Sequence, residues 1–317
     1  ILPAIKKFAA KVKKLYVVEE LEPYMEDLMR AAGIECVGKA LIPIEGELNP
    51  DIVRKSLTGE VTPTLEYDKS VVPGRPPMLC AGCPHVGLFY ELGKIKDVIA
   101  IGDIGCYALS GNPPLNAKDF ALCMGSGFSM AHGAAKIMTK FGENKKIVGV
   151  VGDSTFFHTG MVGIANAVYN GTDMVAVILD NSTTAMTGHQ PNPNTGKRAS
   201  GEIAEVIDIE GVLRALGVRD VATVDPLDQA AAIEAVRRAA DGEGVRAIIF
   251  RSPCIALFRP EKRCKVNTEK CTGCRRCIRE LGCPALVRDG ERVKIDASLC
   301  YGCTVCETVC PFGAISH

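Results

Sequence analysis

Residues 147–156 read Ile-Val-Gly-Val-Val-Gly-Asp-Ser-Thr-Phe, an apolar run that ends in a Gly-Asp-Ser turn. A short run that is apolar at almost every position is typical of a strand buried on both faces of a parallel sheet. Four further runs of this kind alternate with helix-like stretches, so the sequence predicts an α/β fold with a mostly parallel sheet. The predicted strands are Val98–Ile101, Ile147–Val151, Met174–Leu179, Val218–Val224 and Val245–Phe250. The predicted helices are Ser129–Lys140, Gly160–Tyr169 and a third that starts at Asp225-Pro226, with Asp225 as N-cap, and runs to about Ala240.

Composition divides the chain into four predicted segments. The early part looks like the remainder of an α/β unit, with a short apolar strand at Leu15–Val18 and a helix at Glu22–Ala32. A proline-rich stretch follows it, and the last part has short loops and many cysteines. The predicted segments are a partial α/β domain over 1–56, a linker over 57–77, a parallel-sheet domain over 78–258 and a small cysteine-rich domain over 259–317.

Global composition argues against several classes of protein. Lys plus Arg and Asp plus Glu both number 37, so the formal net charge is zero and nothing indicates a nucleic-acid partner. No apolar run approaches the roughly 18 residues that cross a bilayer, and no signal peptide is evident, so we expect no membrane association. The 15 cysteines, many in Cys-x-x-Cys spacing, favour metal binding in a reducing, cytoplasmic setting. Because the chain begins at Ile1 and not at Met, we expect a piece of a longer protein.

The cysteine-rich segment consists of two similar halves. The first reads Cys271-x2-Cys274-x2-Cys277-x5-Cys283-Pro284, and the second reads Cys300-x2-Cys303-x2-Cys306-x3-Cys310-Pro311. The second half matches the bacterial ferredoxin run, in which three thiolates hold one [4Fe-4S] cluster and the fourth ligates the other cluster. The first half differs by two extra residues before its last cysteine. The spacing therefore predicts two [4Fe-4S] clusters, one on Cys271, Cys274, Cys277 and Cys310, the other on Cys300, Cys303, Cys306 and Cys283.

The alternative for these cysteines is a pair of four-thiolate zinc sites. Duplicated Cys triplets followed by Cys-Pro are not a zinc-ribbon pattern, so we favour iron–sulfur clusters. Beside the first triplet, Arg275, Arg276 and Arg279 predict a cationic patch that would steer an acidic partner protein. The simpler interpretation of these arginines is a solvated face.

Polar turns follow two predicted strands of the sheet. Asp153 comes directly after one strand, and Asn181 follows the next. Open α/β sheets bind ligands at the carboxyl ends of their strands, and Mg²⁺ prefers hard oxygen ligands shared with substrate phosphates. Gly152 lets the backbone approach a phosphate, and the helix that opens at Phe156–Gly160 favours an anion at its N-terminus. The residues alone thus predict a Mg-diphosphate site, with a capped turn as the plainer alternative.

Gly-Asp-Ser followed by Asn181, 28 residues after Asp153, is similar to the thiamine diphosphate (TPP) fingerprint. This resemblance implies Mg²⁺ on Asp153, Asn181 and the backbone carbonyl of Thr183, with Ser154 in place of the usual third glycine. The Asn181-Ser-Thr and Asn170-Gly-Thr triplets also match the glycosylation sequon, which we disfavour for a cytoplasmic iron–sulfur protein.

Together with the cluster motifs, this fingerprint makes the chain resemble the 2-oxoacid:ferredoxin oxidoreductases. Four stretches resemble the C-terminal half of the large (alpha) subunit in the indolepyruvate ferredoxin oxidoreductase family. They are Cys80-Ala-Gly-Cys-Pro-His85, Asp103-Ile-Gly-Cys-Tyr107, residues 152–160 and residues 180–190. The implied fold is a TPP-binding domain of the PP type followed by a small α+β ferredoxin-like domain with two [4Fe-4S] clusters. The implied remainder is an N-terminal pyrimidine-binding half, on the same or a separate chain, with the glutamate that contacts the cofactor ring.

The resemblance implies an oxygen-sensitive enzyme of an anaerobic host. Its reaction would be the TPP- and coenzyme A-dependent oxidative decarboxylation of indolepyruvate, phenylpyruvate and 4-hydroxyphenylpyruvate, with electrons passed through the clusters to ferredoxin. A smaller beta subunit is the implied partner, in a heterodimer of dimers. Two alternatives stay open: the same reaction on pyruvate, a branched-chain oxoacid or an arylglyoxylate, and a non-catalytic electron-transfer module.

Further site residues follow from the resemblance. A third [4Fe-4S] cluster is implied on Cys80, Cys83, Cys106 and Cys254, and the alternative is four small buried thiols. The implied cofactor-binding residues are Gly82, Cys83, His85, Gly105, Gly152, Asp153, Ser154, Asn181, Thr183 and Met186. His85, His158 and His189 lie in matching motifs and are the candidate acids or bases, with packing roles as the alternative. Cys36, Cys123 and Cys264 fit no set, and we expect them to be structural.

Overall fold

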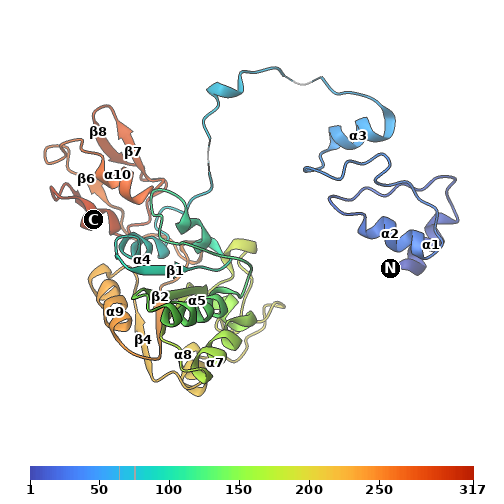
Figure 1. The fold of residues 1–317 in the computed structure, drawn as a ribbon. Helices are drawn as coiled ribbons and strands as arrows, with labels where there is room; N and C mark the ends of the chain where they lie inside the picture. Colours follow the sequence, from blue (N-terminus) through green and yellow to red (C-terminus); the bar gives the residue numbers. More distant parts are fainter. Residues whose placement is uncertain (64, 75) are drawn as a thin grey trace. The chain divides into compact units, whose positions relative to one another are not determined.

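The computed structural model describes residues 1–63, 65–74 and 76–317, drawn as a ribbon in Figure 1. These residues form two compact units, the first ending before Pro76 and the second running over Pro76–His317. The predicted linker over 57–77 spans this boundary, and its residues 64 and 75 lie outside the described residues. Every residue that we predicted for a site belongs to the second unit.

The first unit is small and mostly helical. Its helices are α1 (Leu2–Ala9), α2 (Tyr24–Ala31) and α3 (Pro50–Thr58), with a 3-10 turn η1 (Lys69–Val71). Val17, Met29 and Ile34 form its buried core. The helix expected at Glu22–Ala32 is present as α2, but the strand expected at Leu15–Val18 is reduced to one isolated parallel bridge between Tyr16 and Val37. This apolar segment packs on α2 without extending its pairing into a ladder.

The second unit is built on a five-stranded sheet in the order β1-β2-β3-β5-β4, in which all pairs are parallel. The strands are β1 (Val98–Ile101), β2 (Lys146–Gly152), β3 (Met174–Asp180), β4 (Asp220–Val224) and β5 (Val245–Arg251). All five predicted strands are therefore present, with ends shifted by at most two residues. The runs of β2 and β3 are apolar at successive positions because helices cover both faces of the sheet, whereas the edge strand β4 carries the exposed residues Asp220 and Thr223.

Alternate residues of the central strands enter two separate cores. On β3, Val175, Val177 and Leu179 join one core, and Met174 and Ile178 join the other. The first core is closed by α4 (His85–Leu92) and α9 (Gln229–Asp241), and the second by α5 (Gly127–Phe141), α7 (Met161–Tyr169) and α8 (Ile209–Ala215). The remaining short elements are α6 (Asp153–Thr155), the π-helical turn η3 (Phe156–Gly160) and the 3-10 turns η2 (Cys106–Gly111), η4 (Ala185–Thr187) and η5 (Ile255–Leu257).

Two helix starts differ from the prediction. The helix expected to open after Phe156 instead begins at Asp153 and passes through η3 into α7. α9 begins at Gln229 and is capped by Asp228, whose carboxylate accepts a hydrogen bond from the Ala231 N–H at 3.0 Å. Asp225 uses its carboxylate for a local turn, with Leu227 N–H as donor at 2.9 Å, and therefore does not cap the helix.

The cysteine-rich part folds as a duplicated unit. β6 (Lys265–Val266) pairs with β9 (Ile315–Ser316), and β7 (Leu286–Asp289) pairs with β8 (Arg292–Ile295), both antiparallel. Helices α10 (Arg276–Leu281) and α11 (Val305–Val309) pack on each other. Each helix begins after a left-handed residue, Arg275 or Thr304, that lies between the second and third cysteines of its triplet.

The cysteine-rich part shares a core with the sheet. Leu281, Val305 and Val309 belong to the same buried cluster as α4, α9 and one face of the sheet. Tyr90 of α4 also donates a hydrogen bond to Glu280 of α10 at 2.7 Å. The fold class is thus confirmed: a parallel α/β domain followed by a small α+β domain with two-fold internal repetition. Across the described residues, no helix is both long and apolar enough to cross a membrane.

Candidate functional site

A cavity of about 90 Å³ opens at the carboxyl ends of β2 and β3. Most of the residues that we predicted to bind a cofactor line it, and they come from four segments far apart in the sequence. The predicted residues in its wall are His85, Gly105, Gly152, Asp153, Ser154, Asn181, Thr183 and Met186. The other residues of the wall are Ile104, Cys106, Tyr107, Met124, Thr155, Leu179, Thr184, Ala185 and Thr187.

Asp153 is the carboxylate of this cavity. It follows β2 directly, is 3% exposed, and accepts hydrogen bonds from Asn192 Nδ2 at 3.0 Å and from the Ser154 N–H at 2.8 Å. Burial raises the pKa of Asp153 to about 7, since removal from water penalises the charged form. A bound cation would restore the charge of this carboxylate. The donor set therefore fits a hard cation such as Mg²⁺.

Asn181 follows β3 and faces the same cavity. Its Oδ1 accepts a hydrogen bond from the Thr183 N–H at 3.3 Å, and its Nδ2 lies 3.4 Å from His85 Nε2. Burial lowers the pKa of His85 to about 4, so this imidazole is neutral at physiological pH. An amide donor at Nε2 requires the proton of the neutral ring to sit on Nδ1.

The three candidate histidines lie in different surroundings. His85 is buried and lines the cavity. His158 and His189 are exposed, and neither is in the described wall of the cavity. His158 lies in the π-helical turn η3 and contacts the Thr159 hydroxyl at 3.1 Å. Of the three, the geometry favours only His85 as a group that meets a ligand of this cavity.

Four cysteines that we predicted for a third cluster gather beside the cavity. The thiols of Cys80, Cys106 and Cys254 all act electrostatically on Cys83, whose pKa is raised mainly by burial. Cys106 lines the cavity of Asp153 and Asn181. The Cys254 N–H donates to the Asn181 carbonyl at 2.9 Å, which ties the turn after β5 to the turn after β3. One tertiary arrangement therefore brings the four thiols together next to the cation-binding side chains.

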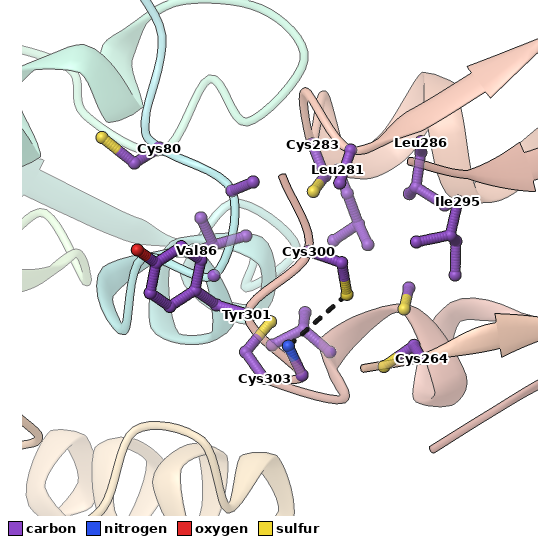
Figure 2. Close-up of a pocket in the computed structure, with 16 residues that line it drawn as sticks. Cys80, Val86, Cys264, Leu281, Cys283, Leu286, Ile295, Cys300, Tyr301 and Cys303 are labelled. Carbon is purple, nitrogen blue, oxygen red and sulfur yellow. Dashed lines mark hydrogen bonds between the residues drawn. The ribbon is translucent and has the colours of Figure 1, made fainter. Parts of the chain in front are cut away.

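The eight C-terminal cysteines divide between two apolar cavities. Cys283, Cys300, Cys303 and Cys306 line one of them, and Figure 2 shows the first three of these side chains around it. Cys271, Cys274, Cys277 and Cys310 line the other. Each set takes three cysteines from one half of the repeat and one from the other half. Backbone N–H groups point at sulfur in both, from Gly302 to Cys300 Sγ at 3.4 Å and from Ala314 to Cys310 Sγ at 3.3 Å.

The surroundings of these thiols suit iron–sulfur clusters. A zinc ion with Zn–S bonds of about 2.3 Å holds its four sulfurs roughly 4 Å apart. Four thiols spread around an apolar cavity, with N–H donors to sulfur, fit a larger iron–sulfur cluster.

Two residues join the sheet domain to one of these cavities. Cys80 and Gly82 lie in the wall of the cavity of Cys283, Cys300, Cys303 and Cys306, together with Tyr301, as Figure 2 shows for Cys80 and Tyr301. Gly82 has φ +81°, and a Cβ on it would lie 2.3 Å from Tyr301 Cβ. A glycine is therefore required at this contact. Gly82 thus serves the junction and lies outside the described wall of the Asp153 cavity.

Several residues of the site could not be singled out from the sequence. Tyr107 is buried in the cavity wall, where its hydroxyl donates to the Ile104 carbonyl at 3.0 Å. Asp103 is fully buried and accepts backbone N–H groups of Gly125 and Gly127 at 2.8 and 2.7 Å, which fixes the start of α5 beside the cavity. Tyr107 and Asp103 lie in a motif that we quoted, but their contacts arise only in the folded chain. No sequence pattern around Asn192 indicated a role in this site.

Two of the three arginines of the predicted cationic patch make other contacts. Arg276 pairs with Glu280 at 2.6 Å, and Arg275 lines the cavity of Cys271, Cys274, Cys277 and Cys310. Arg279 is exposed. The patch as a ferredoxin-binding surface stays a prediction.

Comparisons with known proteins agree with this geometry. Residues 103–250 match the family described as "Thiamine pyrophosphate enzyme, C-terminal TPP binding domain", and residues 293–316 match "4Fe-4S binding domain". The Archaeoglobus fulgidus protein named indolepyruvate oxidoreductase subunit IorA is 40% identical over 98% of this chain and 53% of its own length. The protein of the same name from Methanothermobacter thermautotrophicus gives the same three values.

A solved structure of 2-oxoglutarate:ferredoxin oxidoreductase from Magnetococcus marinus shares 18% identity. It covers 57% of this chain and 66% of that one with a TM-score of 0.49, a likeness too distant to carry an argument.

The fold and the two matched domains define a TPP-binding domain joined to an iron–sulfur domain. The chain spans about half the length of the curated relatives that it matches. Within those limits, the chain resembles a stretch of about half the length of the IorA subunits of indolepyruvate oxidoreductases.

Proposed function

We propose that this chain is part of a TPP-dependent 2-oxoacid:ferredoxin oxidoreductase that acts on aryl 2-oxoacids. In the proposed reaction, a 2-oxoacid and coenzyme A give acyl-CoA, CO₂ and a proton, and two electrons pass one at a time to two ferredoxins. Indolepyruvate, phenylpyruvate and 4-hydroxyphenylpyruvate are the proposed substrates, in keeping with the names of the relatives. The proposed partners are a smaller beta subunit, a pyrimidine-binding half and ferredoxin.

One observation carries this proposal: thiols connect the Asp153 cavity to the cysteine-rich domain. Cys106 lines the Asp153 cavity, and its pKa is raised mainly by burial, with the thiols of Cys80 and Cys254 near enough to contribute. Cys80 in turn lines the cavity of Cys283, Cys300, Cys303 and Cys306. A cation–diphosphate site and an iron–sulfur domain are thereby joined through a third cysteine set within one compact unit. That arrangement suits an enzyme that removes electrons from a substrate held beside the sheet.

The proposed roles of the residues follow from their surroundings. Asp153, Asn181 and the Thr183 carbonyl hold Mg²⁺ and through it the diphosphate, and the buried cavity keeps water away. TPP, when bound, supplies the reactive carbon and the electron sink for decarboxylation. His85, neutral and hydrogen-bonded to Asn181, orients that amide and presents an uncharged ring to the ligand. The cysteine sets hold three [4Fe-4S] clusters, and cluster chemistry of this kind belongs in a reducing compartment.

The test is an anaerobic assay of the full complex for viologen dye reduction with a panel of 2-oxoacids. Coenzyme A- and TPP-dependent reduction that is fastest with arylpyruvates is the expected result. Fast turnover of pyruvate or a branched-chain oxoacid alone would keep the reaction and replace the substrate. If none of the oxoacids supports dye reduction, in a complex with intact clusters and TPP, an electron-transfer module would be favoured.

Two variants distinguish a specific loss of the proposed TPP site from general damage to the fold. Asp153→Asn removes the only carboxylate proposed as a Mg²⁺ ligand, so it should abolish TPP-dependent activity and leave the iron content unchanged. Asp241→Asn, at the exposed end of α9, should leave both unchanged. Iron analysis tests the third set: about twelve irons per chain supports three clusters, and about eight would reject the cluster on Cys80, Cys83, Cys106 and Cys254.

A further inference from the structure

One cysteine outside the proposed ligand sets lies in the wall of a cluster cavity. Cys264 was expected to be structural, but it lines the cavity of Cys283, Cys300, Cys303 and Cys306 and is only 4% exposed. Its thiol lies next to those of Cys306 and Cys300. Figure 2 shows Cys264 close to Cys300 in this cavity. This cavity therefore holds one thiol more than the four that a [4Fe-4S] cluster needs from its own domain.

The internal repeat shows what position Cys264 occupies. It lies seven residues before Cys271, the first cysteine of its half, and Val293 lies seven residues before Cys300. Val293 is 3% exposed and lines the opposite cavity, that of Cys271, Cys274, Cys277 and Cys310. Each half thus places the residue at this position against the cluster cavity of the other half. In one cavity the residue is a thiol, and in the other it is a hydrocarbon.

The same repeat argues that Cys264 is no cluster ligand. The cavity that Val293 lines has four cysteines without any contribution from this position. By the symmetry of the repeat, Cys283, Cys300, Cys303 and Cys306 form the matching complete set. Cys264 is then a thiol against the cluster that is not needed as a ligand, and a thiol has one S–H to donate. In the folded chain its S–H points to Glu307 Oε1 at the long distance of 3.8 Å.

We propose that Cys264 donates a hydrogen bond to sulfur of the cluster held by Cys283, Cys300, Cys303 and Cys306, and that it makes this cluster easier to reduce than it would be with a hydrocarbon side chain at this position. Hydrogen bonds to cluster and cysteinyl sulfurs are among the factors that set cluster potentials. A donor stabilises the reduced cluster more than the oxidised one, because reduction adds negative charge to the sulfurs. Cys264 is therefore a positioning residue for electron flow. This inference rests on the cluster content of the proposed function.

Three variants of the full complex test this role by redox titration monitored by EPR under anaerobic conditions. Cys264→Val removes the donor, reproduces the residue of the other half, and should shift one cluster to lower potential with unchanged iron content. Cys264→Ser keeps an O–H donor and should retain a potential closer to that of the wild type. Val293→Cys places a thiol against the other cluster and should shift that cluster upward. Cys123→Ser, an exposed cysteine outside these cavities, is the control and should shift neither.

The outcomes separate this inference from the proposed function. Unchanged potentials in Cys264→Val, in a complex with its full iron content, would overturn the inference and leave the proposed function standing. A loss of about four irons per chain in Cys264→Val would also overturn it, since Cys264 would then be a ligand. A wild-type complex without iron–sulfur signals would overturn both.

Discussion

The side chains around Asp153 show how a buried carboxylate is prepared for a cation. Its two hydrogen-bond donors, Asn192 Nδ2 and the Ser154 N–H, occupy part of its acceptor capacity and fix its direction. Asn192 is itself 8% exposed, and its Oδ1 accepts from the Asn194 N–H at 2.9 Å. The orientation of the proposed Mg²⁺ ligand therefore depends on an amide from a loop 39 residues further along the chain.

Asn192→Ala should weaken Mg²⁺-dependent TPP binding roughly 10- to 100-fold, the usual cost of removing a hydrogen-bond partner of a metal ligand. Titration calorimetry of TPP into the complex at fixed Mg²⁺ measures this. Asn194→Ala is the matched control, because it keeps the backbone N–H that bonds Asn192 and should bind TPP as the wild type does. Equal affinities for the two variants would show that the Asn192–Asp153 contact does not orient a ligand.

Gly82 lies where the sheet domain and the cysteine-rich domain meet, in close contact with Tyr301. Gly82→Ala should destabilise the second unit by about 2 kcal/mol or more, from backbone strain at φ +81° plus the clash with Tyr301. Gly244→Ala has a similar φ of +73° with open space around it, so it should cost only the strain, about 1 kcal/mol. Urea unfolding of both variants, followed by circular dichroism under anaerobic conditions, gives the comparison. A smaller loss for Gly82→Ala than for Gly244→Ala would contradict the clash.

At the scale of single elements, two aspartates three residues apart, Asp225 and Asp228, are candidates for the N-cap of α9. Both precede the helix, and the sequence favoured Asp225 because proline follows it. In the folded chain Asp228 is the N-cap, since its carboxylate reaches the free N–H of Ala231. The π-helical turn η3 between α6 and α7 is a second element that local patterns did not predict. Such turns are frequent at functional sites, and this one begins three residues after Asp153.

Asp228→Ala should lower the free energy of unfolding by about 1 kcal/mol, because an N–H at the start of α9 loses its acceptor. Asp225→Ala should cost less than half of this, since its hydrogen bond closes a turn outside the helix. Glu234→Ala, on the exposed face of α9, is the control and should be near neutral. Denaturant unfolding midpoints check all three variants. A larger loss of stability in Asp225→Ala than in Asp228→Ala would show that Asp225 is the N-cap.

Across the whole second unit, the sheet domain and the cysteine-rich domain depend on one another. They share a buried core on the α4 and α9 face, whereas the α5, α7 and α8 face has its own core. A small cysteine-rich domain draws much of its folding energy from bound metal. Loss of the clusters should therefore destabilise the sheet domain as well. The effect should be larger on the α4 and α9 face than on the α5, α7 and α8 face.

Removing iron with a chelator should accelerate amide hydrogen exchange in α4 and α9 by roughly tenfold or more, equivalent to about 1.4 kcal/mol of lost local stability. The helices α5 and α7 serve as the internal control, because the sheet separates them from the cysteine-rich domain. Mass spectrometry of the exchanged complex, with and without iron, measures both. Equal acceleration in all four helices would indicate global unfolding and would contradict a face-specific coupling.

The sequence by itself determined the five strands and the fold class, and it predicted how the cysteines of the repeat divide between two clusters. These signals are local: an apolar run marks a strand buried on both faces, and cysteine spacing sets how far each thiol can reach. The tertiary structure alone decided that Asn192 holds Asp153, that Gly82 admits Tyr301 and that Cys264 lies against a cluster cavity. Each of these joins residues far apart in the chain, and such a contact depends on how helices and strands pack. Short-range patterns do not encode that packing, whereas the folded chain specifies it.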